Sequence, residues 1–218
     1  KKAIHDAPYC VDNDFFANGA SKSAIKASQL RLSLGIPESD TVFLFMAKFV
    51  DRKRPLDLIA AAVKNKEYRN FHVILVGGGE LMETCQSAIT TNQLENVHLV
   101  GFINQTELPT YYAAADVFVL PSLYETWGLV LNEAMACGLP GIVSDTCGAT
   151  KDMIIEGETG YSYPMGDVQQ LAKLMMLMAS NSDNCQQMGL RAAGHVQNFS
   201  VPVVVSALKN ILQDISKK

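Results

Sequence analysis

The sequence predicts an α/β domain built on a doubly wound parallel sheet, with helices covering both faces. Two observations predict this fold class. From Thr41 onward, short apolar runs alternate with segments of helix-forming residues, and the runs are apolar at nearly every position. Strands without polar alternation are buried on both faces, which is typical of parallel sheets. Because crossovers between parallel strands are right-handed, the alternation indicates a Rossmann-like domain.

The expected strands are the apolar runs: 41–49, 71–76, 97–100, 117–120, a strand ending at residue 144, and an edge strand at 160–163. Pro55 suits the first position of the helix that follows the first strand. Gly138 and Pro140 end a helix that begins near Gly128. The expected helices lie at 23–34, 55–66, 80–92, 106–115, 128–137, 167–180, 184–199 and from 200 onward, with a short helical piece after Gly148.

The opening residues through Phe16 combine proline, asparagine and aspartate without a helical period, so they predict a linker strand. We therefore divide the chain into an interdomain linker segment (1–20), the Rossmann-like domain (21–199) and a C-terminal helix (200–218).

The composition argues against several classes of function. The net charge of −4 argues against a nucleic-acid backbone as the main partner. No apolar run approaches the roughly 18 residues of a transmembrane segment, and no signal peptide opens the chain. The five cysteines are scattered, odd in number and lack the spacing of metal ligands. These features predict a cytoplasmic protein.

Two carboxylates stand out around the apolar helix that begins near Gly128. Glu125 precedes the helix, and Glu133 lies within it on the face of the first-turn residues. The N–H groups of that first turn have no partners inside the helix and carry the positive end of its dipole. They therefore predict an anion site near both acids. The alternative is that Glu125 is solvated and Glu133 pairs with a lysine elsewhere.

Residues that follow the other expected strands support the same prediction. Lys48, Arg52 and Lys53 follow the first strand, where an anion can bind, unless they form a merely solvated loop. Gly78 lies in a glycine run after the second strand; this run lacks the third glycine of the dinucleotide signature. Phe102 follows the third strand and suits a flat heterocycle, or belongs to the core. The set best matches a nucleotide diphosphate linked to a polyol.

The spacing of Glu125 and Glu133 within PSLYETWGLVLNEAMACGLPGIVS resembles the signature of the retaining nucleotide-sugar glycosyltransferases of the group 1 type. Four further segments resemble that family: APYCVDNDFF its interdomain linker, AKFVDRKRPLDLI its basic diphosphate loop, VHLVGFINQTELPTYYAAADVFVLPS the run before the acidic motif, and GETGYSYPMGDVQQLAKLM the segment after it. The resemblance covers essentially the whole chain. It implies the GT-B architecture, in which two Rossmann-like domains face each other across a cleft.

By this resemblance the chain is the half that binds the nucleotide sugar, without a metal or other cofactor. The N-terminal acceptor-binding domain would be missing from it, and any peripheral membrane contact would be made through that half. The acceptor would be a growing glycan or lipid-linked saccharide.

The resemblance also implies roles for the site residues. Glu133 would hold the ribose and Glu125 the transferred sugar, while Lys48 and Lys53 would neutralise the leaving diphosphate. The remaining donor-binding residues would be the backbone of Thr126, Trp127, Gly128, Leu129 and Val130, the base contacts Phe102 and Ile103, and Gly78 and Arg52. Lys48 stands where arginine is usual in the family, which puts the identity of the donor in doubt more than the reaction.

Two other function classes remain open on the residues alone. A glycosidase could use Glu125 and Glu133 as acid and nucleophile, but the basic loop would then have no role. The second class is a non-catalytic nucleotide-binding module, because the other half of such an enzyme would supply the acceptor site.

Overall fold

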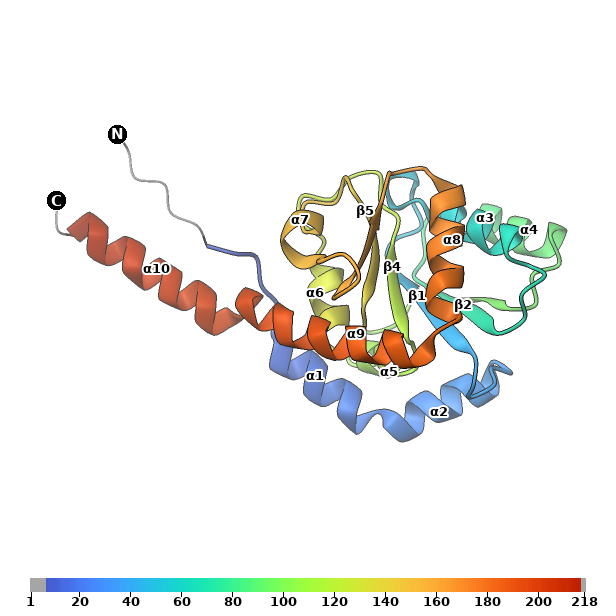
Figure 1. The fold of residues 1–218 in the computed structure, drawn as a ribbon, viewed down its shortest axis with the longest axis horizontal. Coiled ribbons are helices and arrows are strands. Elements are labelled where there is room, and N and C mark those ends of the chain that lie inside the picture. The colour runs from blue at the N-terminus through green and yellow to red at the C-terminus, as the bar shows by residue number, and fades with distance from the viewer. Residues whose placement is uncertain (1–6, 217–218) are drawn as a thin grey trace.

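The computed structural model describes residues 7–216. The first residues of the expected linker (1–6) and the last two of the expected C-terminal helix lie outside the described residues. Six parallel strands form one sheet in the order β3-β2-β1-β4-β5-β6 (Figure 1). The strands are β1 (Thr41–Met46), β2 (Phe71–Val76), β3 (Val97–Gly101), β4 (Val117–Leu120), β5 (Gly141–Ser144) and β6 (Gly160–Tyr163). The predicted fold class is confirmed, and β6 is an edge strand as expected.

The strand order changes direction between β1 and β4, which are hydrogen-bonded neighbours. The chain runs outward from β1 through β2 to β3, and then from β4 through β5 to β6 on the other side. In open parallel sheets, ligands bind at the carboxyl ends of the strands where the order reverses. The loops that follow β1 and β4 therefore meet at this position, although more than 70 residues separate Arg52 from Glu125.

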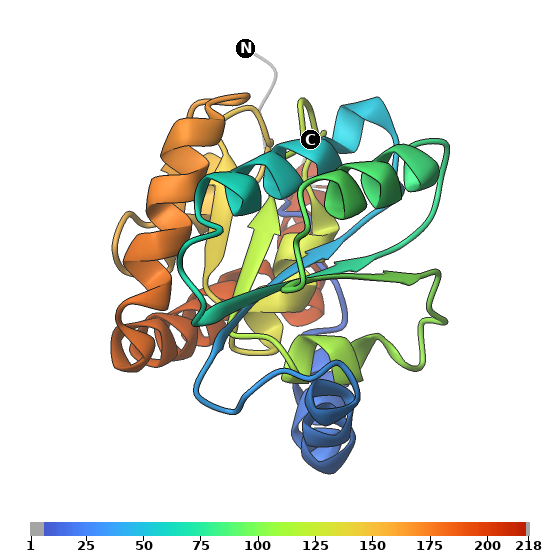
Figure 2. The same ribbon diagram turned by 90° about the vertical axis from the view of Figure 1, so that its right-hand side faces the viewer.

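Alternate residues of each strand contact opposite layers of helices. Phe43 and Phe45 of β1 pack in the cluster that includes α3 (Pro55–Lys64), α4 (Met82–Thr91) and α8 (Val168–Ala179). Val42 and Leu44 pack in a second cluster with α1 (Asn13–Lys22), α5 (Leu108–Ala113) and α6 (Leu129–Ala136). Figure 2 shows the two layers on either side of the sheet. Every β1 side chain is buried, as expected for a strand covered on both faces.

Helix α6 begins and ends within one residue of the predicted bounds. Gly128 caps its start in the left-handed region (φ 111°), and Gly138 follows its end with φ 82°. Its first-turn residue Leu129 is exposed, while Leu131 and the residues at its centre are buried. The helix start is therefore open at the carboxyl edge of the sheet.

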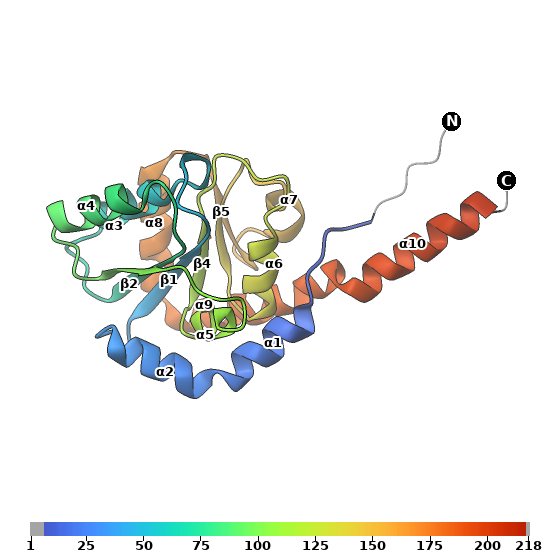
Figure 3. The same ribbon diagram turned by 180° about the vertical axis from the view of Figure 1, so that it is seen from behind.

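The remaining helices complete the two layers and extend from them. They are α2 (Ala24–Ser33), α7 (Thr150–Met153), α9 (Ser182–His195), the 3-10 turns η1 (Asp51–Lys53) and η2 (Val196–Phe199), and α10 (Val201–Ser216). Figures 1 and 3 show α10 extending away from the body of the domain. No helix of the described residues is both long enough and apolar enough to cross a membrane.

Several helices differ from the expected bounds by a few residues, as does the helix expected at 184–199, which is α9 followed by η2. Two further differences change where residues lie in the fold. Residues 13–16 are not a linker strand, because α1 begins at Asn13 and packs on α5 and α6. Asp12 caps this helix by accepting a hydrogen bond from Phe15 N, and Phe16 and Ala20 bury one short stripe. The first strand ends at Met46 instead of residue 49, so Lys48 lies in the following loop.

Candidate functional site

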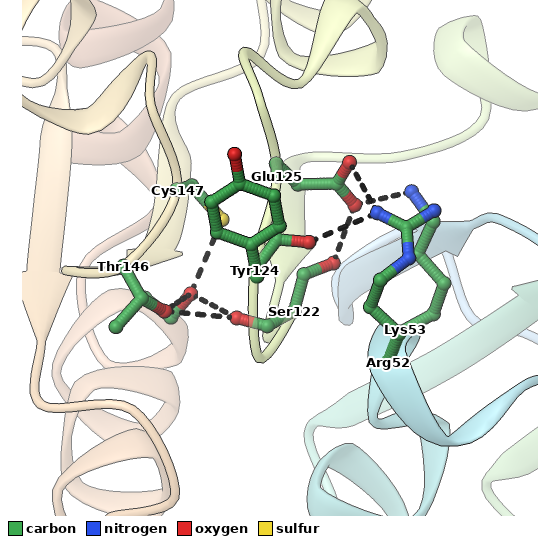
Figure 4. Close-up of polar contacts among 8 residues, drawn as sticks. Arg52, Lys53, Ser122, Tyr124, Glu125, Thr146 and Cys147 are labelled. Atoms are coloured by element: carbon green, nitrogen blue, oxygen red, sulfur yellow. Dashed lines mark hydrogen bonds and ion pairs between the residues drawn. The ribbon is translucent and has the colours of Figure 1, made fainter.

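The loops after β1 and β4 meet around the carboxylate of Glu125 (Figure 4). Lys53 Nζ and Ser122 Oγ both donate to Glu125 Oε1, the hydroxyl at 2.9 Å. Arg52 Nη1 lies 3.2 Å from Glu125 Oε2. The backbones are joined as well, because Leu123 N donates to Arg52 O at 2.8 Å. The predicted residues Arg52, Lys53 and Glu125 are therefore brought together by direct contacts.

Two of the three charged side chains in this cluster are mostly buried. Side-chain exposure is 9% for Glu125 and 15% for Lys53, but 50% for Arg52. A buried carboxylate is stable only when it is paired and hydrogen-bonded. Lys53 and Ser122 meet this requirement from inside the protein, and Arg52 meets it from the solvent side.

The loop after β5 supports the same cluster from the other side. Ser144 Oγ donates to Ser122 O at 2.6 Å, and Gly148 N donates to Glu125 O at 3.0 Å. A Cβ atom on Gly148 would collide with the carbonyl oxygen of Thr126. The absence of a side chain at Gly148 thus allows the two loops to pack closely.

Cys147 lies in this loop but is not suited to nucleophilic chemistry. Burial raises its pKa to about 11, although a hydrogen bond with Ser144 opposes the shift. The side chain is therefore a thiol at neutral pH, and thiols are weak nucleophiles.

Unpaired backbone donors follow Glu125 directly. Within residues 7–216, the N–H groups of residues 126–130 donate to no acceptor, and the first paired one is Leu131 N, which donates to Gly128 O. Consecutive free N–H groups at a helix start favour an anion, because they carry the positive end of the helix dipole. These groups are the predicted backbone of Thr126, Trp127, Gly128, Leu129 and Val130, placed together next to Glu125.

Glu133 lies one turn inside α6 and faces α5. Its Oε2 accepts a hydrogen bond from the hydroxyl of Tyr112 at 2.7 Å. Burial raises the pKa of Glu133, and the bond from Tyr112 opposes that shift. Oε1 accepts no hydrogen bond from the described residues, so it can accept one from a ligand hydroxyl. Within residues 7–216 no lysine pairs with Glu133, in contrast to the alternative considered above, and its partner is the buried Tyr112.

The other predicted residues lie along the same edge without direct contacts to Glu125. Lys48 is exposed in the loop after β1. Gly78 O accepts a hydrogen bond from Phe49 N at 2.9 Å, so the glycine run lies beside that loop. Phe102 is 81% exposed after β3, and Ile103 packs partly against the core. The structure places these residues at the ends of β1, β2 and β3, in the order of the strands.

The Trp127 side chain points away from the cluster. Its ring stacks on Tyr9 with ring centres 5.3 Å apart and packs against Phe199 at 5.7 Å. Its Nε1 donates to Asn132 Oδ1 at 2.8 Å. Only the backbone of Trp127 therefore remains for a ligand, and its ring joins the linker, the end of η2 and the loop after β4.

Two supporting residues are not among the predicted site residues. Ser122 is fully buried and orients Glu125, and Tyr112 is fully buried and orients Glu133. The signal for Ser122 was its position two residues after the end of a strand and three residues before the acid. No pattern in the sequence pointed to Tyr112, because its contact with Glu133 joins two helices. Among residues 7–216, no group of three or more His, Cys, Asp or Glu side chains is arranged to hold a metal ion.

Two surface hollows lie at the opposite, amino-terminal end of the strands. One is lined by residues that include Asp40, Asp116 and Cys137, and the other by residues that include Asp40, Arg69 and His72. Neither contains a predicted site residue. The carboxyl edge is the better candidate, because it combines free backbone donors with lysine, arginine and carboxylate groups.

Comparisons with known proteins agree with this assignment. The sequence model of the family described as Glycosyl transferases group 1 matches residues 27–195. The D-inositol 3-phosphate glycosyltransferase of Corynebacterium diphtheriae is 30% identical over 209 residues, which are 92% of this chain and 48% of that protein. The chain spans about half the length of the curated relatives it matches.

Solved structures show the same fold. Sucrose-phosphate synthase from Thermosynechococcus elongatus superposes with a TM-score of 0.80 and 26% identity, covering 97% of this chain and 52% of that one. The Anabaena protein HepE in complex with UDP superposes with a TM-score of 0.78 and 24% identity, covering 96% of this chain and 56% of that one. The match of the family model over most of the chain is decisive: the chain belongs to the group 1 glycosyl transferases.

Proposed function

We propose that this chain is the donor-binding half of a retaining, metal-independent glycosyltransferase. The whole enzyme moves a sugar from a nucleotide diphosphate sugar to an acceptor such as a growing glycan or a lipid-linked saccharide. One observation carries the proposal: Lys53 contacts Glu125 directly beside five consecutive free N–H groups, at the point where the strand order reverses. The solved HepE complex supports a nucleotide as the ligand, because that protein was crystallised with UDP.

The roles of the residues follow from their charges. The free N–H groups of residues 126–130 and the ammonium groups of Lys53 and Lys48 stabilise the charge that develops on the departing diphosphate. No metal is needed where fixed donors of this kind already face the leaving group. Glu125 and Glu133 accept hydrogen bonds from hydroxyls of the transferred sugar and the ribose, respectively. Phe102 and Ile103 border the base.

The other half of the enzyme supplies the acceptor site in this proposal. The relatives extend to about twice the length of this chain, which is consistent with a second domain. Any peripheral membrane contact is made through that domain. We place the enzyme in the cytoplasm, where the five cysteines of the chain stay reduced, as they are in the structure.

A glycosidase that uses Glu125 and Glu133 is less well supported. A catalytic nucleophile must be able to approach the anomeric carbon. Glu125 is instead held at both oxygens by Lys53, Ser122 and Arg52.

The proposal is tested by calorimetric titration of UDP, GDP and ADP into this chain. We expect one of the three to bind in the millimolar range or tighter, with unchanged affinity after addition of EDTA. Lys53→Ala and Glu133→Ala should weaken that binding at least tenfold, because each removes a charged hydrogen-bonding group from the site. Arg69→Gln is the matched control, since Arg69 is exposed at the opposite end of the sheet. The absence of binding by all three nucleotides contradicts the proposal.

A further inference from the structure

Arg52 holds Glu125 in a way that differs from Lys53. Its Nη1 donates to Tyr124 O at 3.0 Å and lies 3.2 Å from Glu125 Oε2. Its carbonyl oxygen accepts a hydrogen bond from Leu123 N. Arg52 is thus bound at both its backbone and its side chain to the loop that carries Glu125 (Figure 4).

The contacts of Lys53 create a conflict in the proposed site. In this structure the Lys53 ammonium pairs with Glu125 Oε1. A diphosphate at the free N–H groups of residues 126–130 attracts the same ammonium, because it carries more negative charge than one carboxylate. When Lys53 turns to the diphosphate, Glu125 loses its most buried cation.

Arg52 is the cation that remains. It contacts the other carboxylate oxygen, Oε2, and also donates to Tyr124 O, so these contacts do not depend on Lys53. The bond from Ser122 also remains, but a hydroxyl carries no charge to balance Glu125. Without a cation, the buried carboxylate would lose the charge pairing that offsets its desolvation and would turn toward solvent.

We propose that Arg52 is a positioning residue that keeps Glu125 charge-paired and oriented toward the sugar after Lys53 has turned to the diphosphate. This inference rests on the proposed function and assigns Arg52 to the sugar side of the site instead of the diphosphate. It predicts that Arg52 matters for ligands that carry a sugar and matters little for the bare nucleotide diphosphate.

The test compares two ligands that differ only in the sugar. UDP and UDP-glucose, GDP and GDP-mannose, and ADP and ADP-glucose are titrated into this chain by calorimetry, and the pair that binds is kept. Arg52→Gln retains an N–H donor for Tyr124 O but loses the charge. We expect it to raise the Kd of the sugar-bearing ligand about tenfold and that of the bare diphosphate less than twofold. Arg52→Lys keeps the charge and should restore most of the affinity for the sugar-bearing ligand.

The outcomes separate this inference from the proposed function. Arg69→Gln controls for the change in net charge, and a thermal melt of each variant confirms that it folds. If Arg52→Gln weakens both ligands equally, or neither, Arg52 is not a positioning residue for the sugar, although the donor site stands. If the unmodified chain binds none of the six ligands, the proposed function fails, and the inference fails with it.

Discussion

The contact between Lys53 and Glu125 predicts a measurable coupling in the ligand-free chain. Exposed ion pairs contribute about 0.2–1 kcal/mol, and breaking a fully buried pair costs about 3–5 kcal/mol. The side chains of Lys53 and Glu125 are 15% and 9% exposed, so this pair lies between the two cases. Ser122 and Arg52 still hold Glu125 after Lys53→Met, which limits the loss. We therefore expect Lys53→Met to lower the free energy of unfolding by about 2 kcal/mol, a fall in Tm of about 4–8 °C for a domain of this size.

A double-mutant cycle isolates the pair. Thermal and urea unfolding are followed by circular dichroism for Lys53→Met, Glu125→Gln and the double variant, without nucleotide. We expect the double variant to lose less stability than the two single variants together, by at least about 1 kcal/mol, because the second substitution removes a group that has already lost this partner. Losses that add within about 0.5 kcal/mol would refute the reasoning, since they mean that the two side chains do not interact.

Three further predictions concern His98, Gly148 and the bond from Tyr112 to Glu133. Burial and the neighbouring His72 lower the pKa of His98 to about 4, so the folded chain binds protons less readily than the unfolded chain. The stabilisation that depends on neutral His98 is therefore fully present above about pH 6.5, and the free energy of unfolding falls as the pH drops toward 4. Because His98 is partly exposed, we expect a loss of about 1 kcal/mol at pH 5, measured by urea unfolding. Gly148→Ala should lower stability by about 2 kcal/mol and weaken nucleotide binding, because the new methyl group displaces the loop after β4. Tyr112→Phe should raise the pKa of Glu133, measured by NMR titration of its carboxyl carbon, because it removes the hydrogen bond that opposes the effect of burial.

Each of these predictions has a control. His98→Asn removes the titrating ring and should flatten the loss of stability between pH 7 and 5; a slope equal to that of the unmodified chain contradicts the assignment. Gly194→Ala adds a methyl group where no atom lies within 4 Å and should not destabilise the chain. Equal effects of the two glycine substitutions would contradict the account of Gly148. An unchanged pKa of Glu133 in Tyr112→Phe would show that the hydroxyl does not act on that acid.

The fold could be predicted because its four central strands, β2, β1, β4 and β5, are buried on both faces. The run 117–120 is apolar throughout and the run 71–76 is apolar except at His72, and both appear with the predicted bounds. The position of the candidate site follows from the same pattern, because parallel strands place their carboxyl ends at one edge. The meeting of Lys53 with Glu125 follows from the adjacency of β1 and β4.

What could not be predicted depends on contacts between distant side chains. Helix α1 buries only a short stripe, so its sequence shows turn residues more clearly than a helical period. The bond from Tyr112 to Glu133 joins α5 to α6. The direction of the Trp127 ring is set by Tyr9 and Phe199, which come from opposite ends of the chain.

The most direct test of the donor-site assignment is a map of the backbone amides that respond to a nucleotide diphosphate. Amide chemical shifts of the ¹⁵N-labelled chain are recorded by NMR while UDP, GDP or ADP is added. We predict that the largest changes fall on residues 126–130, whose N–H groups are free in this structure, and on Lys53. Changes confined to the amino-terminal end of the sheet, around Asp40 and His72, would contradict the assignment.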